Sequence, residues 1–581
     1  MRKSGTKTGI ALGVSMGIAC LYGLLVYYTT GFIYAIADDV IMRDIASGAF
    51  TGTPDGHLIF VRYALGYLLS RLYLVNGSVD WYGFFMAGAL FLAMAAVLYR
   101  GLARESSLLW KAVYTGIVLG LFGIGLLPHA AQFEWTISAA ALGSAALYLY
   151  VTLEGKRDGQ LPDSFLIWLL LLLTFCIRYD VFFMVMPGFG IVFLWRFIKR
   201  QKKGISFCFG EIVLPFLVFV SVGAVALIES QAYSTADWKE FKRFQHARSE
   251  VYDYSGVPSY EANPAFFEEL GLGEHEVRNL RHYALYLVEG LDAEMMEALS
   301  KEAVRQAGME MGGKIKSGLD LSLRQLVNPE YAELSLPTLF FIMGILAFLF
   351  RSRKKGTLIP LLLFLGAEGV LWLLLGFAGR LPERVAFSLH LTMMLGLAAC
   401  FARLWFEKEE NGKGNLWKRV TAPLILFLCL GAVIFKLQRT VLWNQEKRAM
   451  DDSYQQFKAA SREEDGELYF IETYMAEPVG GASVTVKGGQ GINRCLTLGD
   501  WYTTSPVDEA RMRALDIENV EETILNNPNA YLVVRDLEEP GFLGTYFSGK
   551  YPETELVCQE VRSVGGRNYY LYRPEKTGRE E

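Results

Sequence analysis

Residues 9–32 read GIALGVSMGIACLYGLLVYYTTGF, an apolar run without a charged side chain. A membrane-spanning helix needs roughly 20 apolar residues, so this run is long enough to cross a bilayer. Arg2, Lys3 and Lys7 precede the run, and residues 35–37 mimic a signal-peptidase site. The apolar stretch is longer than the roughly 7–15 residues of a cleavable signal core. We therefore predict a membrane anchor that is not cleaved.

Further apolar runs follow the first one along the chain. The sequence is 52% hydrophobic and 20% charged, whereas soluble domains are roughly 45–50% apolar and about 25% charged. Long apolar runs between short polar loops are typical of a polytopic all-α membrane protein. We predict about eleven transmembrane helices within residues 1–437. The predicted spans are 9–32, 80–99, 108–128, 132–152, 163–177, 181–198, 209–229, 335–350, 357–378, 385–405 and 418–437.

Lysine and arginine gather in alternate loops of this topology, on the same side as the basic N-terminal residues. Cytoplasmic loops of membrane proteins carry an excess of such residues. We therefore predict a multi-pass protein of the plasma (cell) membrane with a cytoplasmic N-terminus and an extracytoplasmic C-terminus. The alternate loops carry Arg100, Arg104 and Lys111; Lys156 and Arg157; Arg196, Lys199, Arg200, Lys202 and Lys203; Arg351, Arg353, Lys354 and Lys355; and Lys408, Lys413, Lys418 and Arg419.

Three polar regions then fall on the extracytoplasmic side. The first loop covers 33–79, and its segment His57–Tyr73 has apolar residues at helical spacing, which predicts an amphipathic helix on the membrane surface. The second region, 230–334, is polar and mostly helical in pattern. The third region is the tail 438–581, in which buried strands and helices are predicted to form a small α/β domain. Its predicted strands are ELYFIE (467–472), AYLVVR (530–535) and RNYYLY (567–572).

Two adjacent carboxylates, Asp38 and Asp39, open the first loop directly after the first span. Both cannot be desolvated cheaply as anions, so the pKa of one of them is expected to rise, which suits a general base. The alternative is a solvated helix end, since an aspartate near a helix N-terminus is favourable.

Two short loops carry further charges at membrane depth. His129 and Glu134 flank the turn at 128–135, where they are either functional or interfacial residues of an aromatic belt with Trp135. Arg178 and Asp180 lie between two short apolar runs. Charges at this depth are costly and normally have partners. The arginine is therefore suited to a phosphate, or else the two residues form a structural pair.

The last short loop holds Arg380 and Arg384 on either side of a proline. Two bidentate donors suit a lipid-linked phosphate or diphosphate, although both arginines would also snorkel to lipid headgroups. Glu368 lies in the middle of a span and is predicted to be the structural partner of one of these arginines. Arg248 and Asp253, in the second polar region, are candidates for substrate contacts, but we favour a surface position for them.

Several other functions lack support in the sequence. The net charge of −5 gives no reason to expect a nucleic-acid partner. No glycine-rich nucleotide-binding motif is present. The histidines have no metal-ligand spacing and no Asp-x-Asp pair occurs, so we do not predict a bound metal. Cys495 and Cys558 lie in the polar tail and are candidates for a disulfide, which the sequence alone does not decide.

Taken together, these features resemble the GT-C class of glycosyltransferases, which use polyprenyl-phosphate-linked sugars. The resemblance rests on the acidic pair, the surface helix after it, the charged short loops, the late pair of arginines and the terminal α/β domain. It is nearest to protein mannosyltransferases and lipid A aminoarabinose transferases. The Trp-Trp-Asp signature of oligosaccharyltransferases is absent, which argues against peptide-asparagine glycosylation.

The resemblance implies a metal-independent, inverting sugar transfer from a polyprenyl-phosphate donor to an acceptor hydroxyl outside the cytoplasm. No cofactor is implied besides the lipid-linked co-substrate, and the acceptor would be a cell-envelope glycan, lipid or protein. The implied residues are Asp39 or Asp38 as the base; Arg178, Arg380 and Arg384 for the donor phosphate; and His57, His129, Glu134 and Asp180 for substrate binding. The alternatives are a transporter or flippase of lipid-linked sugars, and a non-catalytic membrane scaffold.

Overall fold

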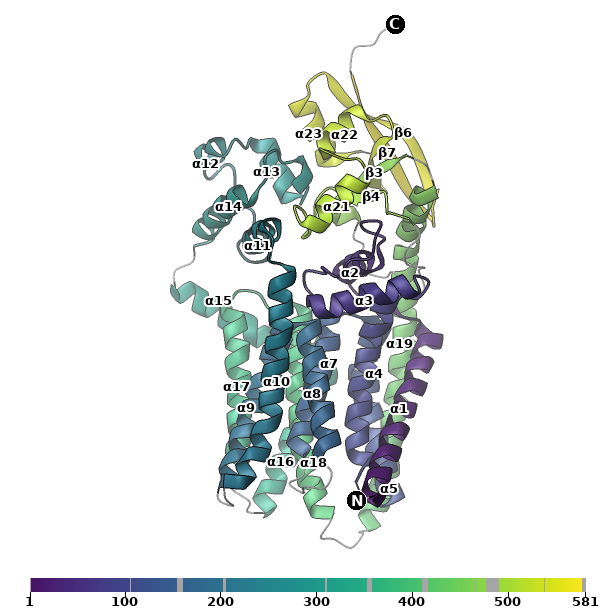
Figure 1. Cartoon of the computed structure of the whole chain (residues 1–581), viewed down its shortest axis with the longest axis vertical. Helices are drawn as coiled ribbons and strands as arrows, with labels where there is room; N and C mark the ends of the chain where they lie inside the picture. The colour runs from purple at the N-terminus through teal and green to yellow at the C-terminus, as the bar shows by residue number, and fades with distance from the viewer. Residues whose placement is uncertain are drawn as a thin grey trace.

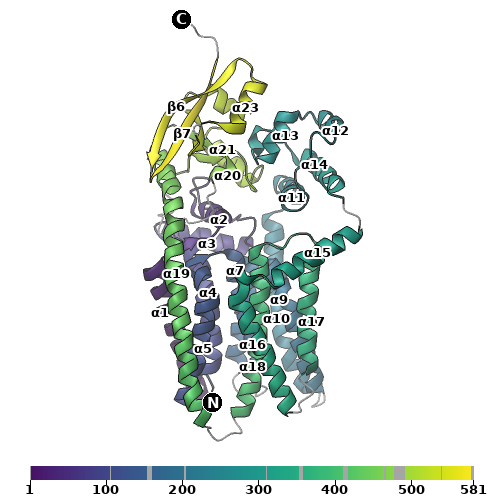
Figure 2. The same ribbon diagram turned by 180° about the vertical axis from the view of Figure 1, so that it is seen from behind.

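In the computed structural model, the described residues are 2–104, 106–153, 160–201, 205–308, 311–352, 358–409, 416–463, 466–476, 491–537 and 539–576. The chain is a polytopic α-helical membrane protein with a C-terminal α/β domain. Long helices form a bundle, and two smaller bodies sit together at one end of it (Figures 1 and 2). The N-terminus lies at the other end of the bundle, far from the C-terminus (Figure 1).

Nine of the described helices are long and apolar enough to cross a membrane. Two further predicted spans fall on α8 (Gln160–Ile177), whose apolar part is shorter, and on the first part of α19 (Leu416–Glu463). Every predicted span therefore coincides with a helix. The nine helices are α1 (Arg2–Thr30), α4 (Trp81–Leu102), α5 (Leu108–Gly125), α7 (Trp135–Thr152), α9 (Tyr179–Gln201), α10 (Ile205–Ala232), α16 (Ala332–Ser352), α17 (Leu358–Phe377) and α18 (Glu383–Glu409).

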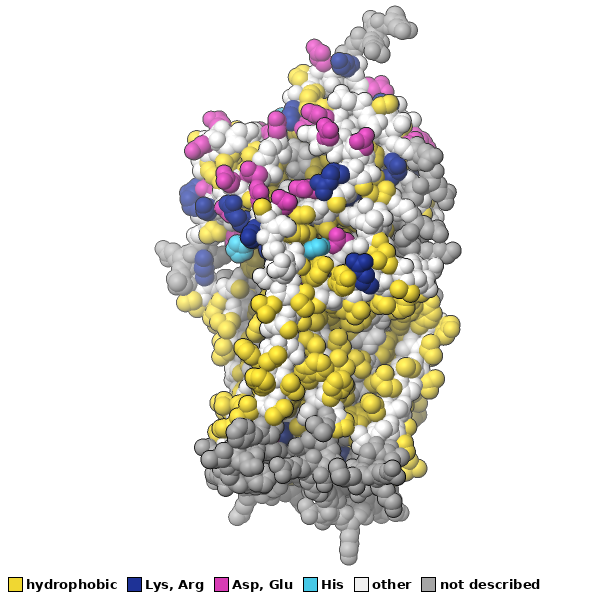
Figure 3. Space-filling view, in the orientation of Figure 1, with side chains coloured by type: hydrophobic (Ala, Val, Ile, Leu, Met, Phe, Trp, Pro, Cys, Tyr) yellow, Lys and Arg dark blue, Asp and Glu magenta, His cyan; other side chains and the backbone are white. Residues whose placement is uncertain are grey.

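Helix α7 is the centre of the bundle and is buried along its whole length. It packs against α4, α8, α9 and α18. Its sequence is rich in alanine, serine and glycine, and such small residues let neighbouring helices approach closely. Ser144 and Thr392 join α7 to α18 by a hydrogen bond of 3.0 Å. The outer helices instead expose apolar side chains, which form a belt across the visible face of the bundle below the charged end (Figure 3).

The first loop is held against the end of the bundle by a short sheet. Strand β1 (Ile33–Tyr34) pairs in parallel with β2 (Gln132–Phe133), which follows the short helix α6 (Leu127–Ala131). The acidic pair therefore lies beside Glu134. Helix α2 (Ala37–Ser47) begins directly after β1, and α3 (Tyr63–Val75) lies across the bundle end (Figure 1). A helix is therefore present in the predicted segment, but it begins at Tyr63 rather than at His57. Its location at the membrane surface stays a prediction.

The second polar region, called the insertion below, is helical as predicted and has its own apolar core, which includes Phe244, Phe267 and Met296. Its amphipathic helix α15 packs on α17 at the bundle end. The insertion comprises α11 (Ala236–Ser249), the π-helical turn η2 (Glu250–Ser255), α12 (Pro264–Glu269), α13 (Glu274–Arg281), η3 (Leu285–Leu287), α14 (Ala293–Gln306), α15 (Met311–Leu326) and η4 (Pro329–Tyr331).

The C-terminal domain contains a five-stranded sheet in the order β4-β3-β5-β7-β6. Strand β3 pairs in parallel with β4 and β5, whereas β7 pairs in antiparallel fashion with β5 and β6. The three predicted strands are confirmed as β3, β5 and β7; β4 and β6 were not predicted. The elements are β3 (Leu468–Ile471), α20 (Thr473–Ala476), β4 (Cys495–Thr497), α21 (Pro506–Ala514), α22 (Val520–Asn526), β5 (Ala530–Arg535), α23 (Gly541–Lys550), β6 (Thr554–Val564) and β7 (Arg567–Lys576).

The insertion and the C-terminal domain pack closely against each other. A Cβ atom on Gly499 would lie 2.5 Å from the carbonyl oxygen of Tyr283, so only glycine fits at this contact. The Tyr286 backbone N–H donates to the Leu498 carbonyl at 3.0 Å, and the Tyr286 hydroxyl donates to Asp508 at 2.6 Å. The two bodies therefore form one roof over the bundle end.

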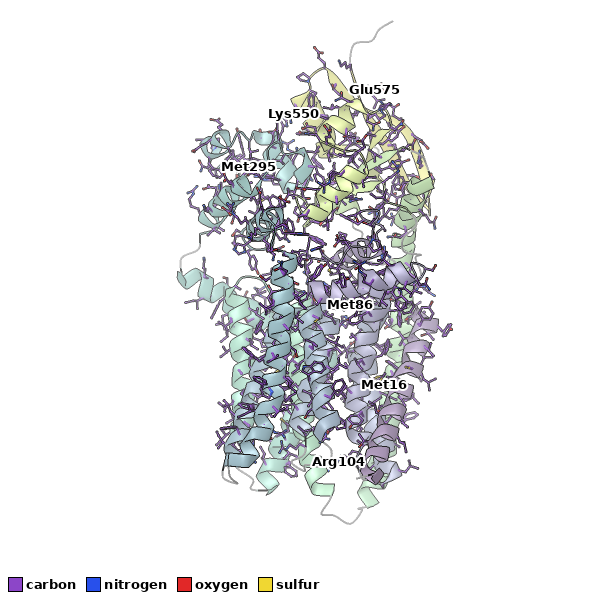
Figure 4. The ribbon with its side chains drawn as sticks, viewed as in Figure 1. Met16, Met86, Arg104, Met295, Lys550 and Glu575 are labelled. Atoms are coloured by element: carbon purple, nitrogen blue, oxygen red, sulfur yellow. The ribbon has the colours of Figure 1, made fainter. Side chains whose placement is uncertain are left out.

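Arg104, in the predicted basic loop after α4, lies at the end of the bundle opposite to Lys550 and Glu575 (Figure 4). This agrees with the predicted separation of the basic loops from the acidic pair. The assignment of that end to the cytoplasm remains a prediction. Several residues on which it rests lie outside the described part of the chain: Lys156, Arg157, Lys202, Lys203, Arg353, Lys354, Lys355 and Lys413.

Candidate functional site

A cavity of about 1050 Å³ lies between the bundle end and the roof. Elements far apart in the sequence line it: the start of α2, the loop before α3, the start of α7, the α8–α9 turn, the end of α17 and the start of α18. The predicted residues that line it are Asp38, Arg178, Asp180, Arg380 and Arg384. The topology thus brings most of the predicted charged residues to one site.

Arg384, in the first turn of α18, faces two carboxylates without a close hydrogen bond to either. Its Nη1 lies 3.9 Å from Asp38 Oδ2, and its Nε lies 3.6 Å from Glu134 Oε1. Both distances exceed those of ordinary hydrogen bonds. Within the described part of the chain, Arg384 Nε and Glu134 Oε1 are buried and have no hydrogen-bond partner. The guanidinium therefore keeps donors that a bound anion can use.

Asp38 projects into the cavity with about a quarter of its side chain exposed, 26%. Burial raises the pKa of its carboxyl, while the positive charges of Arg384 and Arg178 oppose that shift. The net effect is an upward shift of the pKa. A carboxylate whose pKa lies above its usual value is a stronger proton acceptor, which suits general-base catalysis.

Arg178, in the α8–α9 turn, is the second cation of this part of the cavity. Its Nη1 donates to the Thr136 hydroxyl, and its guanidinium carbon lies 4.2 Å from the centre of the Trp135 ring. Asp180 is 3.8 Å away and is itself 58% exposed, so this ion pair is weak. Burial and the nearby charge of Arg384 lower the pKa of Arg178. A phosphate placed between the two arginines would relieve their repulsion.

Asp39 does not line this cavity, although it was the first residue predicted as the base. It is fully buried; Tyr82 donates to its Oδ1 at 2.6 Å, and the Trp135 backbone N–H donates to its Oδ2 at 3.4 Å. Both residues belong to α2, and successive helical residues point about 100° apart. Asp38 therefore faces the cavity while Asp39 faces α4. Burial raises the pKa of Asp39 well above its usual value.

Arg380 differs from Arg384 because a carboxylate already binds it closely. Its Nη1 lies 2.6 Å from Asp253 Oδ2 in the insertion, and its guanidinium carbon is 5.7 Å from the Tyr254 ring. Arg248 also faces the cavity; it is only 6% exposed, and it donates to the Tyr283 hydroxyl at 2.5 Å. The surface position predicted for Arg248 and Asp253 is therefore wrong, because the insertion folds over the bundle end.

The predicted histidines are not among the residues that line the cavity. His57 packs among aromatic rings, and the centre of its ring lies 5.0 Å from that of the stacked Trp238 ring. Its Nδ1 lies 2.6 Å from Asp55 Oδ1. The ring of His129 lies 4.1 Å from that of Phe387, and burial lowers the pKa of His129 to about 3. Both histidines thus have packing roles in this structure.

Glu368 does not pair with the late arginines, contrary to prediction. It lies in α17 and is 2% exposed. Among the described residues, its Oε2 has no hydrogen-bond partner. The sequence pattern placed it correctly inside a span but did not identify its surroundings.

The roof supplies site residues that the sequence did not reveal. Asp500 and Trp501 follow β4, Thr473 and Tyr474 begin α20, and all four line the cavity. Trp501 packs on Phe60 of the first loop at 4.6 Å. These residues lie in a one-turn helix and in a turn of a polar tail, and no motif distinguishes them from ordinary polar residues.

One wall of the same cavity is apolar and lies at the level of the bundle. Phe183 of α9 and Leu371 and Leu374 of α17 line it. Phe183 is 58% exposed and Leu374 is 59% exposed. The cavity therefore continues from the arginines onto a surface that would face lipid.

Within the residues that the structure describes, no three histidine, cysteine, aspartate or glutamate side chains come together as metal ligands. The site is thus built from carboxylates, guanidinium groups and aromatic rings.

Comparison with protein-family models gives no match, and comparison with curated proteins gives none either. Among solved structures, two crystal structures of ArnT from Cupriavidus metallidurans are similar to this chain. The apo state is 10% identical with a TM-score of 0.39, and the state bound to undecaprenyl phosphate is 11% identical with a TM-score of 0.41. Each covers 95% of this chain and 97% of the other chain. At so low an identity, the functional residues have to be identified from the contacts of this chain itself.

Proposed function

We propose that this chain is a membrane glycosyltransferase that moves a sugar from a polyprenyl-phosphate donor to an acceptor hydroxyl on the extracytoplasmic face. One observation carries the proposal. Asp38, Arg178 and Arg384 open into a single cavity that has an apolar wall toward the bundle and a polar roof. A reaction between a membrane-anchored phosphate ester and a water-side hydroxyl needs this combination of surfaces.

The donor phosphate is assigned to Arg178 and Arg384. Their nearest carboxylates lie at 3.6–3.9 Å, so an incoming phosphate competes with weak partners. Arg380 is a poorer candidate because Asp253 binds it at 2.6 Å. Planar guanidinium groups bind phosphate oxygens in bidentate fashion, which fixes the orientation of the donor. The prenyl chain would leave the cavity along Phe183, Leu371 and Leu374.

Asp38 is assigned as the general base. Its carboxylate takes the proton of the acceptor hydroxyl while the hydroxyl oxygen forms a bond to the anomeric carbon of the donor sugar. The bond from that carbon to the phosphate oxygen breaks on the opposite face, so the configuration is inverted. The polyprenyl phosphate leaves with the bonding electron pair, and Arg178 and Arg384 stabilise its developing negative charge.

Asp39 and Glu134 are assigned as positioning residues. Asp39 ties α2 to Tyr82 and to the first turn of α7. Glu134 lies behind Arg384 and orients its guanidinium toward the cavity. Neither residue is needed to contact substrate in this scheme.

A transporter or flippase of lipid-linked sugars is the second candidate, and Glu368 favours it. A buried carboxyl inside a span, with no described partner for one oxygen, would suit a proton relay. The two functions differ in their dependence on Asp38. Loss of the base would stop sugar transfer but would leave movement of the intact lipid-linked sugar unchanged.

The test is thin-layer chromatography of lipid-linked sugars from a deletion strain complemented with variants of the chain. We expect a lipid-linked sugar to accumulate in the deletion strain and in strains with Asp38→Asn or Arg384→Ala. Wild type and Arg243→Ala should prevent the accumulation; Arg243 is a matched control because it is 51% exposed and pairs with Glu297 outside the cavity. A deletion strain with an unchanged lipid-linked sugar pool would reject the proposal.

A further inference from the structure

Two tyrosines at the roof are more exposed than the other aromatic side chains described there. In the described residues of 236–308 and 466–576, Tyr254 and Tyr474 are the only Phe, Tyr or Trp side chains that are at least half exposed, at 51% and 58%. One belongs to the insertion and the other to the C-terminal domain, yet both line the same cavity. Large apolar rings are normally buried in such bodies, so exposed rings at a cavity indicate a binding surface.

Each of these rings has support from the protein while much of its surface stays open. The Tyr474 ring stacks on the Tyr283 ring, with 6.3 Å between the ring centres. Tyr283 is held in place by a hydrogen bond from Arg248 to its hydroxyl and by the Tyr252 ring, whose centre is 4.4 Å from its own. The Tyr254 ring has the Arg380 guanidinium 5.7 Å from its centre. We call Tyr254 and Tyr474 the tyrosine platform.

Charged groups border the platform. Asp253 accepts a hydrogen bond from the Ser249 hydroxyl at 2.7 Å, and its Oδ2 lies 2.6 Å from Arg380 Nη1. Asp500 contributes a buried carboxylate to the same cavity, near enough for its charge to act on Tyr283. Saccharides have flat C–H faces that pack on aromatic rings and hydroxyl groups that bond to carboxylates and guanidinium groups. A lipid chain would instead need a continuous apolar wall, which in this cavity lies at the level of the bundle.

We propose that the tyrosine platform binds a saccharide, and that the acceptor of the transfer reaction is therefore a glycan. This inference rests on the proposed function and narrows its acceptor. The cavity of about 1050 Å³ is slightly larger than the roughly 300–1000 Å³ of ordinary single-ligand pockets, so it has room for two substrates. The donor phosphate is assigned to Arg384, beside Asp38 and Glu134, whereas the platform adjoins Arg380 and Tyr283. The platform is thus placed for the acceptor sugar rather than for the donor phosphate.

The test measures binding of two probes to the full chain in lipid nanodiscs, because maltoside detergents would supply a competing sugar. The first probe is a panel of neutral oligosaccharides of glucose, mannose, galactose, xylose and arabinose, followed by saturation-transfer NMR. The second probe is undecaprenyl phosphate. The variants are Tyr254→Ala and Tyr474→Ala, with Tyr67→Ala as the control, since Tyr67 is 45% exposed on α3 and does not line the cavity.

We expect at least one oligosaccharide to bind, and each platform variant to weaken that binding about three- to tenfold, the loss that corresponds to one aromatic contact. Tyr67→Ala should leave it unchanged, and all three variants should bind undecaprenyl phosphate as wild type does. Binding of undecaprenyl phosphate without any oligosaccharide binding would overturn the glycan acceptor but leave the proposed function standing. Failure of undecaprenyl phosphate to bind wild type would instead count against the proposed function.

One further measurement distinguishes binding of the acceptor sugar from binding of the donor sugar. Undecaprenyl phosphate and undecaprenyl phosphate mannose are compared as ligands of each platform variant. If each platform variant binds both lipids with nearly the affinity of wild type, the acceptor assignment is supported. A loss confined to the sugar-bearing lipid would show that the platform binds the donor sugar, and would overturn the inference.

Discussion

At the scale of single residues, the site depends on which of two neighbouring aspartates faces the cavity. We expect Asp38→Asn to lower the rate of sugar transfer about 10²–10⁴-fold, the range contributed by a general base. Protein abundance and thermal stability should stay near those of wild type, because Asp38 is only partly buried. The measurement is transfer of a radiolabelled sugar by purified protein. A fully active Asp38→Asn variant would remove the base assignment.

Asp39→Asn should instead lower the stability of the protein and leave part of the transfer activity. This carboxylate accepts two hydrogen bonds in a fully buried position, and damage to such bonds costs about 1–3 kcal/mol of stability. We expect a lower melting temperature in a thermal unfolding assay, with residual transfer activity in the protein that remains folded. Asp180→Asn, which alters an exposed carboxylate on the same cavity, is the control for stability.

The pH dependence of the reaction gives a second test at this scale. Asp38 must be deprotonated to act as a base, and its pKa is raised, so activity should fall on the acid side at a pH above the usual pKa of aspartate. Arg384 opposes that rise. Replacing it in Arg384→Gln should therefore raise the pKa further and move the acid limb of the kcat/KM profile to higher pH. An acid limb at the wild-type position, or at lower pH, would contradict this electrostatic coupling.

The sequence identified these charged residues because ionised side chains are rare at membrane depth. From these charges we expected Asp39, Arg178 and Arg380 to open into one cavity. Both arginines do line one cavity, but the aspartate beside them is Asp38 rather than Asp39. The sequence did not predict which aspartate faces inward, because this depends on where α2 begins. It favoured a surface position for Arg248 and did not identify Tyr254 or Trp501, since the roles of all three come from the docking of the roof onto the bundle.

At the scale of elements, the C-terminal domain holds the helix that carries the proposed base. Phe50 lies just after α2 and is 4% exposed. The centre of its ring is 4.8 Å from the centre of the Tyr502 ring and 4.5 Å from the guanidinium carbon of Arg511. The Asn493 backbone N–H donates to the Ala49 carbonyl at 3.0 Å. Lys458, near the end of α19, lies 3.8 Å from Asp44 in α2 itself. Helix α2 is therefore attached to the roof as well as to the bundle.

We expect Phe50→Ala to loosen α2, because removal of a buried phenyl ring costs about 3–5 kcal/mol. Hydrogen–deuterium exchange should increase over residues 37–47, and the rate of transfer should fall more than donor binding does. Phe216→Ala is the control, since Phe216 is 60% exposed on the apolar belt. Unchanged exchange in α2 would show that the C-terminal domain does not position the base.

The elements themselves were predictable where the sequence pattern is strong. Long apolar runs and the buried strands β3, β5 and β7 carry such patterns. Strand β4 has only three residues, and β6 lies at the sheet edge with most of its side chains exposed, so neither shows a run of buried residues. The pairing of β1 with β2 involves two residues from each strand and leaves no pattern in the sequence.

At the scale of the whole molecule, the proposed function requires the roof to lie outside the cytoplasm. The roof and the N-terminus lie at opposite ends of the bundle (Figure 2), so the location of one determines that of the other. A natural probe is available in the C-terminal domain. Cys558 on β6 is exposed, whereas Cys495 on β4 is buried, and both are free thiols rather than the disulfide considered from the sequence.

We expect a membrane-impermeant maleimide to label Cys558 in intact cells, because an exposed thiol reacts readily at the surface. Cys558→Ser should abolish the labelling, because Cys176 and Cys495 are buried and the other four cysteines, Cys20, Cys208, Cys400 and Cys429, belong to the bundle helices α1, α10, α18 and α19. Labelling that appears only after the membrane is opened would place the roof in the cytoplasm. The proposed donor, which has to be reached from the outer leaflet, would then have no access to Arg178 and Arg384, and the enzyme assignment would fail together with the topology.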